Sequence, residues 1–193
     1  MRINAHVLTG DGVEQIRCQK QSHLLETLDT IVLHATEGSN AMSSAQYLAH
    51  KDTPVSAHIV IARSGSVIQL LPFNVRACHA GRSEYGGRKN FNDFSIGIEL
   101  DNAGPLHRRG DRFFSWFNRE YTPDEVFTTI ENGRAAYYHR YTQAQTERTA
   151  EVCSLLRQHY LLRHLVRHSD ITTRKTDPGP AFPFEEVKAI TGF

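Results

Sequence analysis

The stretch Phe94-Ser95-Ile96-Gly97-Ile98-Glu99-Leu100 alternates large apolar side chains with small or polar ones. This period of two predicts a β-strand that turns its isoleucine and leucine side chains to one face and Ser95, Gly97 and Glu99 to the other. Two small residues beside a lone carboxylate leave room above it, as in a pocket floor, although a glycine within a strand can instead mark a bulge. The stretch therefore predicts a core strand with Glu99 as a candidate functional residue.

Further strand and helix patterns surround this stretch. Thr30-Ile31-Val32-Leu33-His34 is a β-branched apolar run, typical of a strand buried on both faces at the centre of a sheet. Helical spacing of Val152, Leu155, Leu156 and His159 predicts a helix over about 146–160. We also expect a hairpin over 55–71 with its turn at Ser64-Gly65-Ser66, a short helix through Ala45 to Ala49, and a last helix through Val187 and Ile190 that Pro183 opens.

Length and composition indicate an ordinary globular protein. The chain has 193 residues, which fits one domain over 1–193, and its net charge of +1 argues against a broad surface for nucleic acid. No apolar run approaches the roughly 18 residues that a membrane span needs. Three separated cysteines form no disulfide framework, and the first residues lack a secretory pattern. We therefore expect a cytoplasmic protein without a membrane span.

Residues 101–141 differ in composition from the rest of the chain. They hold half of the chain's aromatic residues: Phe113, Phe114, Trp116, Phe117, Tyr121, Phe127, Tyr137, Tyr138 and Tyr141. We interpret the segment as an aromatic-rich insertion after the Glu99 strand. Its aromatic side chains either pack a subdomain onto the body or form a dimer contact. The alternative is that some of them, Trp116 in particular, extend a substrate groove or cover it.

Candidate metal ligands lie far apart in the sequence. His34, His168 and Asp177 have the residue types of a catalytic zinc site, which takes three protein ligands and leaves one position open. Their spacing forms no short motif, so their convergence depends on the fold. Each residue also has a structural alternative. His34 is then a satisfied core histidine, Glu99 pairs with an arginine, and the loop of Lys175 and Asp177 is a solvated turn.

Six blocks of the sequence, in this order, resemble the zinc-dependent N-acetylmuramoyl-L-alanine amidases, and most closely the branch that recycles anhydro-muropeptides. The blocks are Ile31-Val32-Leu33-His34, Val55-Ser56-Ala57-His58, His79-Ala80-Gly81, Asn92-Asp93-Phe94-Ser95-Ile96-Gly97-Ile98-Glu99-Leu100, His168-Ser169-Asp170-Ile171 and Arg174-Lys175-Thr176-Asp177-Pro178-Gly179-Pro180. The resemblance covers about Asp29 to Phe184. It implies an α/β fold of the peptidoglycan-recognition-protein type, with a central mixed β-sheet flanked by helices.

The resemblance also implies a catalytic site. His34, His168 and Asp177 would bind one zinc ion per chain. Glu99 would be the general base that takes a proton from the attacking water, and Lys175 would stabilise the oxyanion. The bond cleaved would join N-acetylmuramic acid to L-alanine of the stem peptide, so the partner would be a muropeptide or peptidoglycan.

Substrate contacts are less closely specified. His58 and His79 match positions of the family and are candidates for lining the groove, with a structural hydrogen-bonding role as the alternative. Arg88 and Arg174 are candidates for binding carboxylates of the stem peptide, because guanidinium binds carboxylate bidentately. The recycling branch tends to carry Asn and Trp where this chain has Ala35 and Cys78. These two differences put the substrate preference in question more than the metal site.

Other functions fit the same residues. A peptidoglycan-binding module of this fold can lack catalysis, and a zinc hydrolase of the same mechanism can act on another amide. A phage-type lysin or an exported effector would act on the intact wall instead of soluble fragments. The sequence leaves the oligomeric state open.

Overall fold

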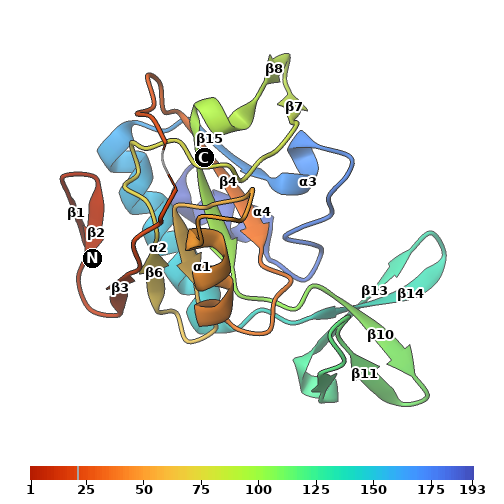
Figure 1. The fold of residues 1–193 in the computed structure, drawn as a ribbon. Helices are drawn as coiled ribbons and strands as arrows, with labels where there is room; N and C mark the ends of the chain where they lie inside the picture. The colour runs from red at the N-terminus through yellow and green to blue at the C-terminus, as the bar shows by residue number, and fades with distance from the viewer. Residues whose placement is uncertain (21) are drawn as a thin grey trace.

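The six-stranded sheet at the centre of the molecule is mixed, as expected (Figure 1). A computed structural model describes residues 1–20 and 22–193. The strand order is β15-β4-β9-β5-β6-β3; β15, β4, β9 and β5 run parallel to one another, and β6 is antiparallel to β5. The strands are β3 (Val13–Gln15), β4 (Thr30–Ala35), β5 (Ile59–Ile61), β6 (Val67–Gln69), β9 (Ser95–Leu100) and β15 (His164–Arg167).

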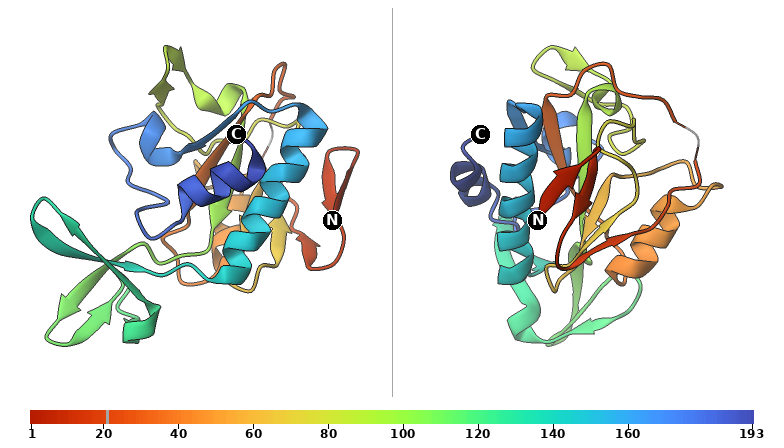
Figure 2. Two further views of the ribbon diagram at one scale, coloured as in Figure 1. Left: turned by 180° about the vertical axis from the view of Figure 1, so that it is seen from behind. Right: turned by 90° about the vertical axis from the view of Figure 1, so that its left-hand side faces the viewer.

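Helices cover both faces of this sheet. Figure 2 shows α2 (Gln143–Tyr160) and α4 (Phe184–Thr191) on one side and α1 (Ala41–Ala49) on the other. The shorter elements are α3 (His168–Ile171), the hairpins β1 (Arg2–Asn4) with β2 (Val7–Thr9) and β7 (Glu84–Tyr85) with β8 (Arg88–Lys89), and the 3-10 turns η1 (Phe91–Asp93) and η2 (Pro123–Glu125). No helix in the described part of the chain is both long and apolar enough to cross a bilayer.

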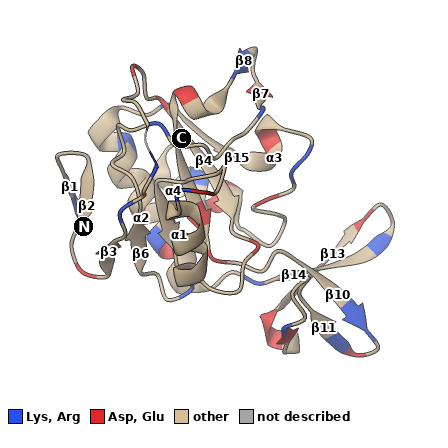
Figure 3. Ribbon diagram, viewed as in Figure 1, with Lys and Arg blue, Asp and Glu red and all other residues tan. Residues whose placement is uncertain are grey.

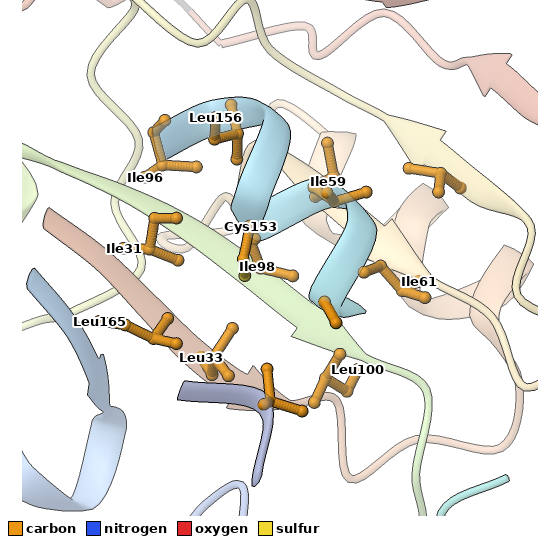
Figure 4. Close-up of a cluster of buried hydrophobic side chains, with 14 of the residues drawn as sticks. Ile31, Leu33, Ile59, Ile61, Ile96, Ile98, Leu100, Cys153, Leu156 and Leu165 are labelled. Carbon is orange, nitrogen blue, oxygen red and sulfur yellow. The ribbon is translucent and has the colours of Figure 1, made fainter. Parts of the chain in front are cut away.

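The larger hydrophobic core lies between the sheet and α2. Ile96, Ile98 and Leu100 of β9 are fully buried there, so the predicted alternation of this strand is confirmed (Figure 4). α2 supplies Val152, Cys153 and Leu156 to the same core. His159, which the helical spacing placed on this face, is exposed, and Cys153 lies in the core instead. The helix begins before residue 146 because the side chain of Thr142 caps it by accepting the Gln145 N–H.

Residues 101–141 form a lobe that projects from the body, here called the arm (Figure 1). Its five strands are in the order β12-β11-β10-β14-β13 and span Glu120–Tyr121, Arg112–Phe114, Pro105–Arg109, Arg134–His139 and Val126–Glu131. Its small core contains Ala103, Leu106, Tyr121 and Val126, with Phe113, Phe117 and Tyr137 packed against it. Four of the nine aromatic side chains of this segment thus pack in the arm's own core.

Charged residues of both signs are spread over the body and the arm in the view of Figure 3. Several arginines of the arm lie against aromatic rings, as Arg109 does with Phe114 at 4.9 Å and Arg119 with Tyr121 at 5.2 Å. Such contacts use the arginines within the arm itself. The expectation that nucleic acid is not a partner stays a prediction.

Candidate active site

Three potential metal ligands meet at one edge of the sheet. β4 and β15 are parallel neighbours, and their register pairs Leu33 with Arg167, so His34 and His168 follow side by side. The two Nδ1 atoms are 3.0 Å apart, and Asp177 Oδ2 lies 3.0 Å from that of His168 and 3.5 Å from that of His34. All three side chains are buried. The fold therefore gathers residues that are up to 143 positions apart in the chain into one cluster.

The protonation states in this cluster suit a divalent cation. Burial lowers the pKa of His34 to about 4, so its imidazole is neutral near pH 7 and keeps a lone pair for a metal. Burial pushes the pKa of Asp177 upward, but hydrogen bonds with His168 and His34 outweigh it and hold that pKa below its ordinary value. Two imidazoles with one carboxylate, all facing one point, are a donor set typical of catalytic zinc. The residues present fit the ion that the resemblance implies.

His79 contacts His34 on the side of its ring opposite to Asp177. Its Nδ1 lies 2.9 Å from His34 Nε2, and its Nε2 lies 3.2 Å from Ser95 Oγ, which in turn donates to the Phe91 carbonyl. When His34 uses Nδ1 for a metal, its Nε2–H donates to His79, and this fixes the direction of the whole chain of hydrogen bonds. His79 therefore orients a ligand, although it also lines the cleft.

Gly97 makes room for this histidine. A Cβ at Gly97 would lie 2.4 Å from His79 Cγ, far inside van der Waals contact. The space above the β9 strand is thus filled by His79, and the strand pairs regularly with β4 on one side and β5 on the other without a bulge.

We expect His79→Ala to weaken zinc binding by about 10–100-fold, the usual cost of removing a partner that orients a metal ligand. Zinc affinity measured by competition with a chromogenic chelator checks this. His159→Ala is the matched control, since His159 is exposed on α2. An unchanged zinc affinity for the His79 variant would show that the contact between the two histidines does not orient His34.

Glu99 lies beside the metal cluster without a partner of its own. It pairs in register with His34 across β4 and β9, and its Oε2 is buried with no hydrogen-bond partner. Burial, with the nearby charge of Asp177, raises the pKa of Glu99 to about 8. No arginine of the described residues forms an ion pair with it. The alternative of a structural ion pair therefore does not hold.

A buried carboxylate without a partner destabilises the fold once it ionises. The folded-state pKa of about 8 exceeds the ordinary 4.5, so the group's contribution to stability is intact below pH 4.5 and is lost as the pH rises toward 8. We expect metal-free wild type to lose at most about 5 kcal/mol of unfolding free energy through this group over that range. The unfolding free energy of Glu99→Gln should not fall in this way over the same pH range. Urea denaturation of both chelated proteins at several pH values checks it, and parallel pH profiles would contradict it.

A cleft of about 610 Å³ opens above the cluster. Lys175 stands exposed on its rim, two residues before buried Asp177. The alternative that this loop is only a solvated turn therefore fails for Asp177. The lining residues are His34, Ala35, Thr36, Glu37, Gly38, Ser39, Ser43, Ser44, Tyr47, Leu48, Val55, Ser56, His79, Glu99, Trp116, His168, Lys175 and Asp177. The three potential metal ligands, an unpaired carboxylate and an exposed cation thus share one open space.

Two of the predicted substrate contacts have partners within the protein. His58 is fully buried, accepts the Gly97 N–H at Nδ1 and donates from Nε2 to the Val75 carbonyl at 2.8 Å, so it is a structural residue. Arg88 is bound to Asp29 at 2.9 Å and lies over the Phe94 ring at 4.0 Å. Neither side chain lines the cleft, because tertiary partners already satisfy both.

Arg174 lies in a neighbouring cavity of about 490 Å³ that also has Arg82 and Lys89 in its wall. Its Nη2 donates to the Arg82 carbonyl at 2.8 Å while the side chain stays exposed. The wall also contains Glu84, which pairs with Lys89 at 3.4 Å, and Asp170. A substrate contact of Arg174 stays a proposal.

Sequence reasoning missed Glu37 and Tyr47. Glu37 lines the cleft, is half-buried, and has a pKa that burial raises above its ordinary value. Its backbone has φ +48°, a left-handed conformation that the local sequence does not predict. Tyr47 was indistinguishable from any helix-surface residue before the fold placed α1 beside the cleft.

A mixed sheet with two histidines, an aspartate and a half-buried glutamate at one edge has the architecture expected of a metal-dependent hydrolase site. The chain belongs to the N-acetylmuramoyl-L-alanine amidase family Amidase_2, whose profile matches residues 25–180. It is 35% identical over 139 residues to 1,6-anhydro-N-acetylmuramyl-L-alanine amidase AmpD of Escherichia coli (strain K12), a match that covers 70% of this chain and 58% of that protein. AmiD of the same strain is 27% identical over 95% of this chain and 64% of its own length.

Solved structures agree with the family. A crystal structure of AmpD superimposes with a TM-score of 0.68 at 26% identity and covers 98% of this chain and 99% of that one. AmiD from E. coli, in complex with anhydro-N-acetylmuramic acid-L-Ala-D-gamma-Glu-L-Lys, gives 0.65 at 26% identity over 91% of this chain and 62% of its own. The chain spans less than two thirds of the length of the curated relatives it matches.

Proposed function

We propose that the protein is a zinc-dependent hydrolase that cleaves the amide bond between N-acetylmuramic acid and L-alanine in muropeptides. One observation carries the proposal: Glu99, whose Oε2 is buried without a hydrogen-bond partner, lies in register with His34 of the His34-His168-Asp177 cluster, in the same cleft as Lys175. Family membership and the substrate named for the related AmiD structure support the choice of bond.

The reaction needs a base, an acid and a stabilising charge, and this chain supplies each. Zinc on the three ligands would provide Lewis acidity, which polarises a carbonyl and makes water more acidic. Glu99 would take the proton of the attacking water and return it to the leaving amine of L-alanine. Lys175 would place its ammonium by the oxygen that becomes negative in the transition state.

A non-catalytic binding module is the main alternative, and the burial of Glu99 speaks against it. Burying an unpaired carboxylate costs stability and adds nothing to the binding of a neutral glycan. A catalytic role in proton transfer would explain why the protein keeps a carboxylate that lowers its stability. We therefore favour the enzyme.

Mass spectrometry of anhydro-muropeptides and of intact sacculi incubated with the protein tests the proposal. We expect release of free stem peptide from one or both, with uptake of one water at the amide bond. Cleavage of neither would favour the binding module, and cleavage of another bond would redirect the activity. The comparison of the two substrates also separates an enzyme of soluble fragments from a wall-degrading lysin or effector. The expected cytoplasmic location stays a prediction for cell fractionation.

Lys175→Met is expected to lower kcat by about 10²–10³-fold, the usual effect of removing one donor to a developing oxyanion. The zinc content should not change, because Lys175 is exposed and not a ligand. Steady-state kinetics with metal analysis check this, and Lys188→Met on α4 is the control. A change in KM alone would assign Lys175 to ground-state binding instead.

A further inference from the structure

Trp116 occupies an unusual place for a large aromatic side chain. It is 66% exposed at the connection between β11 and β12 of the arm, yet its Nε1 donates to the Glu37 carbonyl of the body at 2.7 Å. The same ring lines the cleft that contains Glu99 and His168. The indole is thus held by a hydrogen bond at its N–H while its ring face stays exposed, so the face is available to bind a ligand.

The arm holds this ring in position. Buried Ser115 accepts the Asn118 N–H at its carbonyl and donates its own N–H to the Arg119 carbonyl, which closes the turn around Trp116. Asn118 adopts φ +62°, as such turns require. Phe117 meets the indole at 5.4 Å with the two ring planes perpendicular. Little conformational freedom is left to lose when a ligand binds, and this favours affinity.

The wall around Trp116 has the chemistry of a site for a neutral polyol. Tyr47, 57% exposed on α1, lines the same cleft. The same lining contains hydroxyl groups, among them those of Ser39, Ser43 and Ser44. Of the lining residues from 36 to 56, Glu37 alone is charged. Arg82, Lys89 and Arg174 instead line the neighbouring cavity.

We propose that Trp116 is a stacking platform for the muramyl sugar ring, which would place the glycan toward the arm and the stem peptide toward the neighbouring cavity. The identity of the sugar rests on the proposed function. The C–H groups on one face of a pyranose are weakly positive and are attracted to the negative face of an indole. The hydroxyl groups of α1 and its preceding loop would bind the sugar's polar rim. Carboxylates of the peptide would meet Arg82 and Arg174, since Lys89 is paired with Glu84.

Trp116 is the only tryptophan of the chain, so its fluorescence reports this contact directly. The zinc-loaded protein would be titrated with N-acetylmuramic acid and, separately, with the tripeptide L-Ala-γ-D-Glu-L-Lys, with excitation at the red edge where tyrosine does not absorb. We expect a saturable change in emission with the sugar and none with the peptide. No change with the sugar, or the same change with both, would overturn the platform.

Variants separate stacking from a purely structural role of the arm. Trp116→Ala should weaken inhibition of muropeptide hydrolysis by the sugar about 3- to 10-fold, as expected for loss of one aromatic contact, and leave inhibition by the peptide unchanged. Trp116→Phe keeps a ring face and should retain most of the sugar affinity. Ile130→Ala, an exposed apolar residue of the arm outside the cleft lining, should affect neither. Equal weakening of both inhibitors by Trp116→Ala would refute the platform.

The two proposals can fail separately. A protein that hydrolyses muropeptides while its tryptophan emission ignores the sugar would keep the activity and lose the platform. Calorimetric binding of the sugar to wild type, lost in Trp116→Ala, in a protein that hydrolyses no muropeptide, would support the platform and refute the amidase.

Discussion

Replacing Asp177 by alanine is expected to abolish both zinc binding and hydrolysis. Asp177 gives the cluster its only formal negative charge, and its Oδ2 lies within 3.5 Å of both histidine Nδ1 atoms. Without the carboxylate the dication would keep only two protein ligands, one fewer than a catalytic zinc site typically has, so we expect the ion to be lost. Zinc Lewis acidity contributes several kcal/mol to stabilising such transition states, and kcat should fall by about 10³-fold or more.

Metal analysis of the purified variant and the rate of stem-peptide release check this result. Asp52→Ala is a suitable control, because Asp52 is an exposed aspartate in the turn after α1. Circular dichroism should show that the variant remains folded. A folded Asp177→Ala protein with a full complement of zinc would exclude Asp177 as a ligand.

Glu99→Gln is expected to lower kcat by about 10²–10⁴-fold while zinc stays bound. Glutamine has nearly the same shape as glutamate and cannot take a proton from water. Because Glu99 is outside the ligand group, its loss should leave the metal in place. The muropeptide should still bind, so KM should change little compared with kcat.

Steady-state kinetics and zinc analysis of the same preparation separate these effects. The variant is also expected to be more stable than wild type near neutral pH without metal, which excludes misfolding as the cause of a low rate. An unchanged kcat would remove Glu99 as the base. Loss of zinc together with activity would make it a ligand instead.

The β9 strand shows how much of the structure a local sequence pattern can predict. Its alternation predicted both the buried face of Ile96, Ile98 and Leu100 and the opposite face with Glu99. The strand that ends near His34 was equally predictable, because a short β-branched apolar run is typical of a buried strand. The convergence of His34 with His168 required the parallel pairing of β4 with β15, which no local pattern encodes. There the family resemblance supplied the missing information.

The partners of side chains that bind residues distant in the sequence could not be predicted. Arg88 could bind a substrate carboxylate or Asp29, and only the tertiary fold brings Asp29 to it. His58 and His79 look alike in sequence, yet His58 is bonded to backbone groups and His79 contacts His34. Each outcome depends on which polar group the fold leaves nearby.

The arm was recognisable by composition but not by position. Its many aromatic residues indicated a packed unit, and a separate core around Leu106 and Tyr121 now accounts for several of them. Nothing in the sequence brought Trp116 to the carbonyl of Glu37, which lies 79 positions away. That contact depends on how the arm leaves the body after β9.

Zinc titration of the metal-stripped enzyme tests the central claim most directly. Stem-peptide release from an anhydro-muropeptide would be measured as zinc is added back in steps. The account predicts no release without metal and a linear rise that ends at one zinc per chain, with no such rise for Asp177→Ala. Release that is independent of zinc, or a zinc-loaded protein that leaves the amide bond intact, would contradict it.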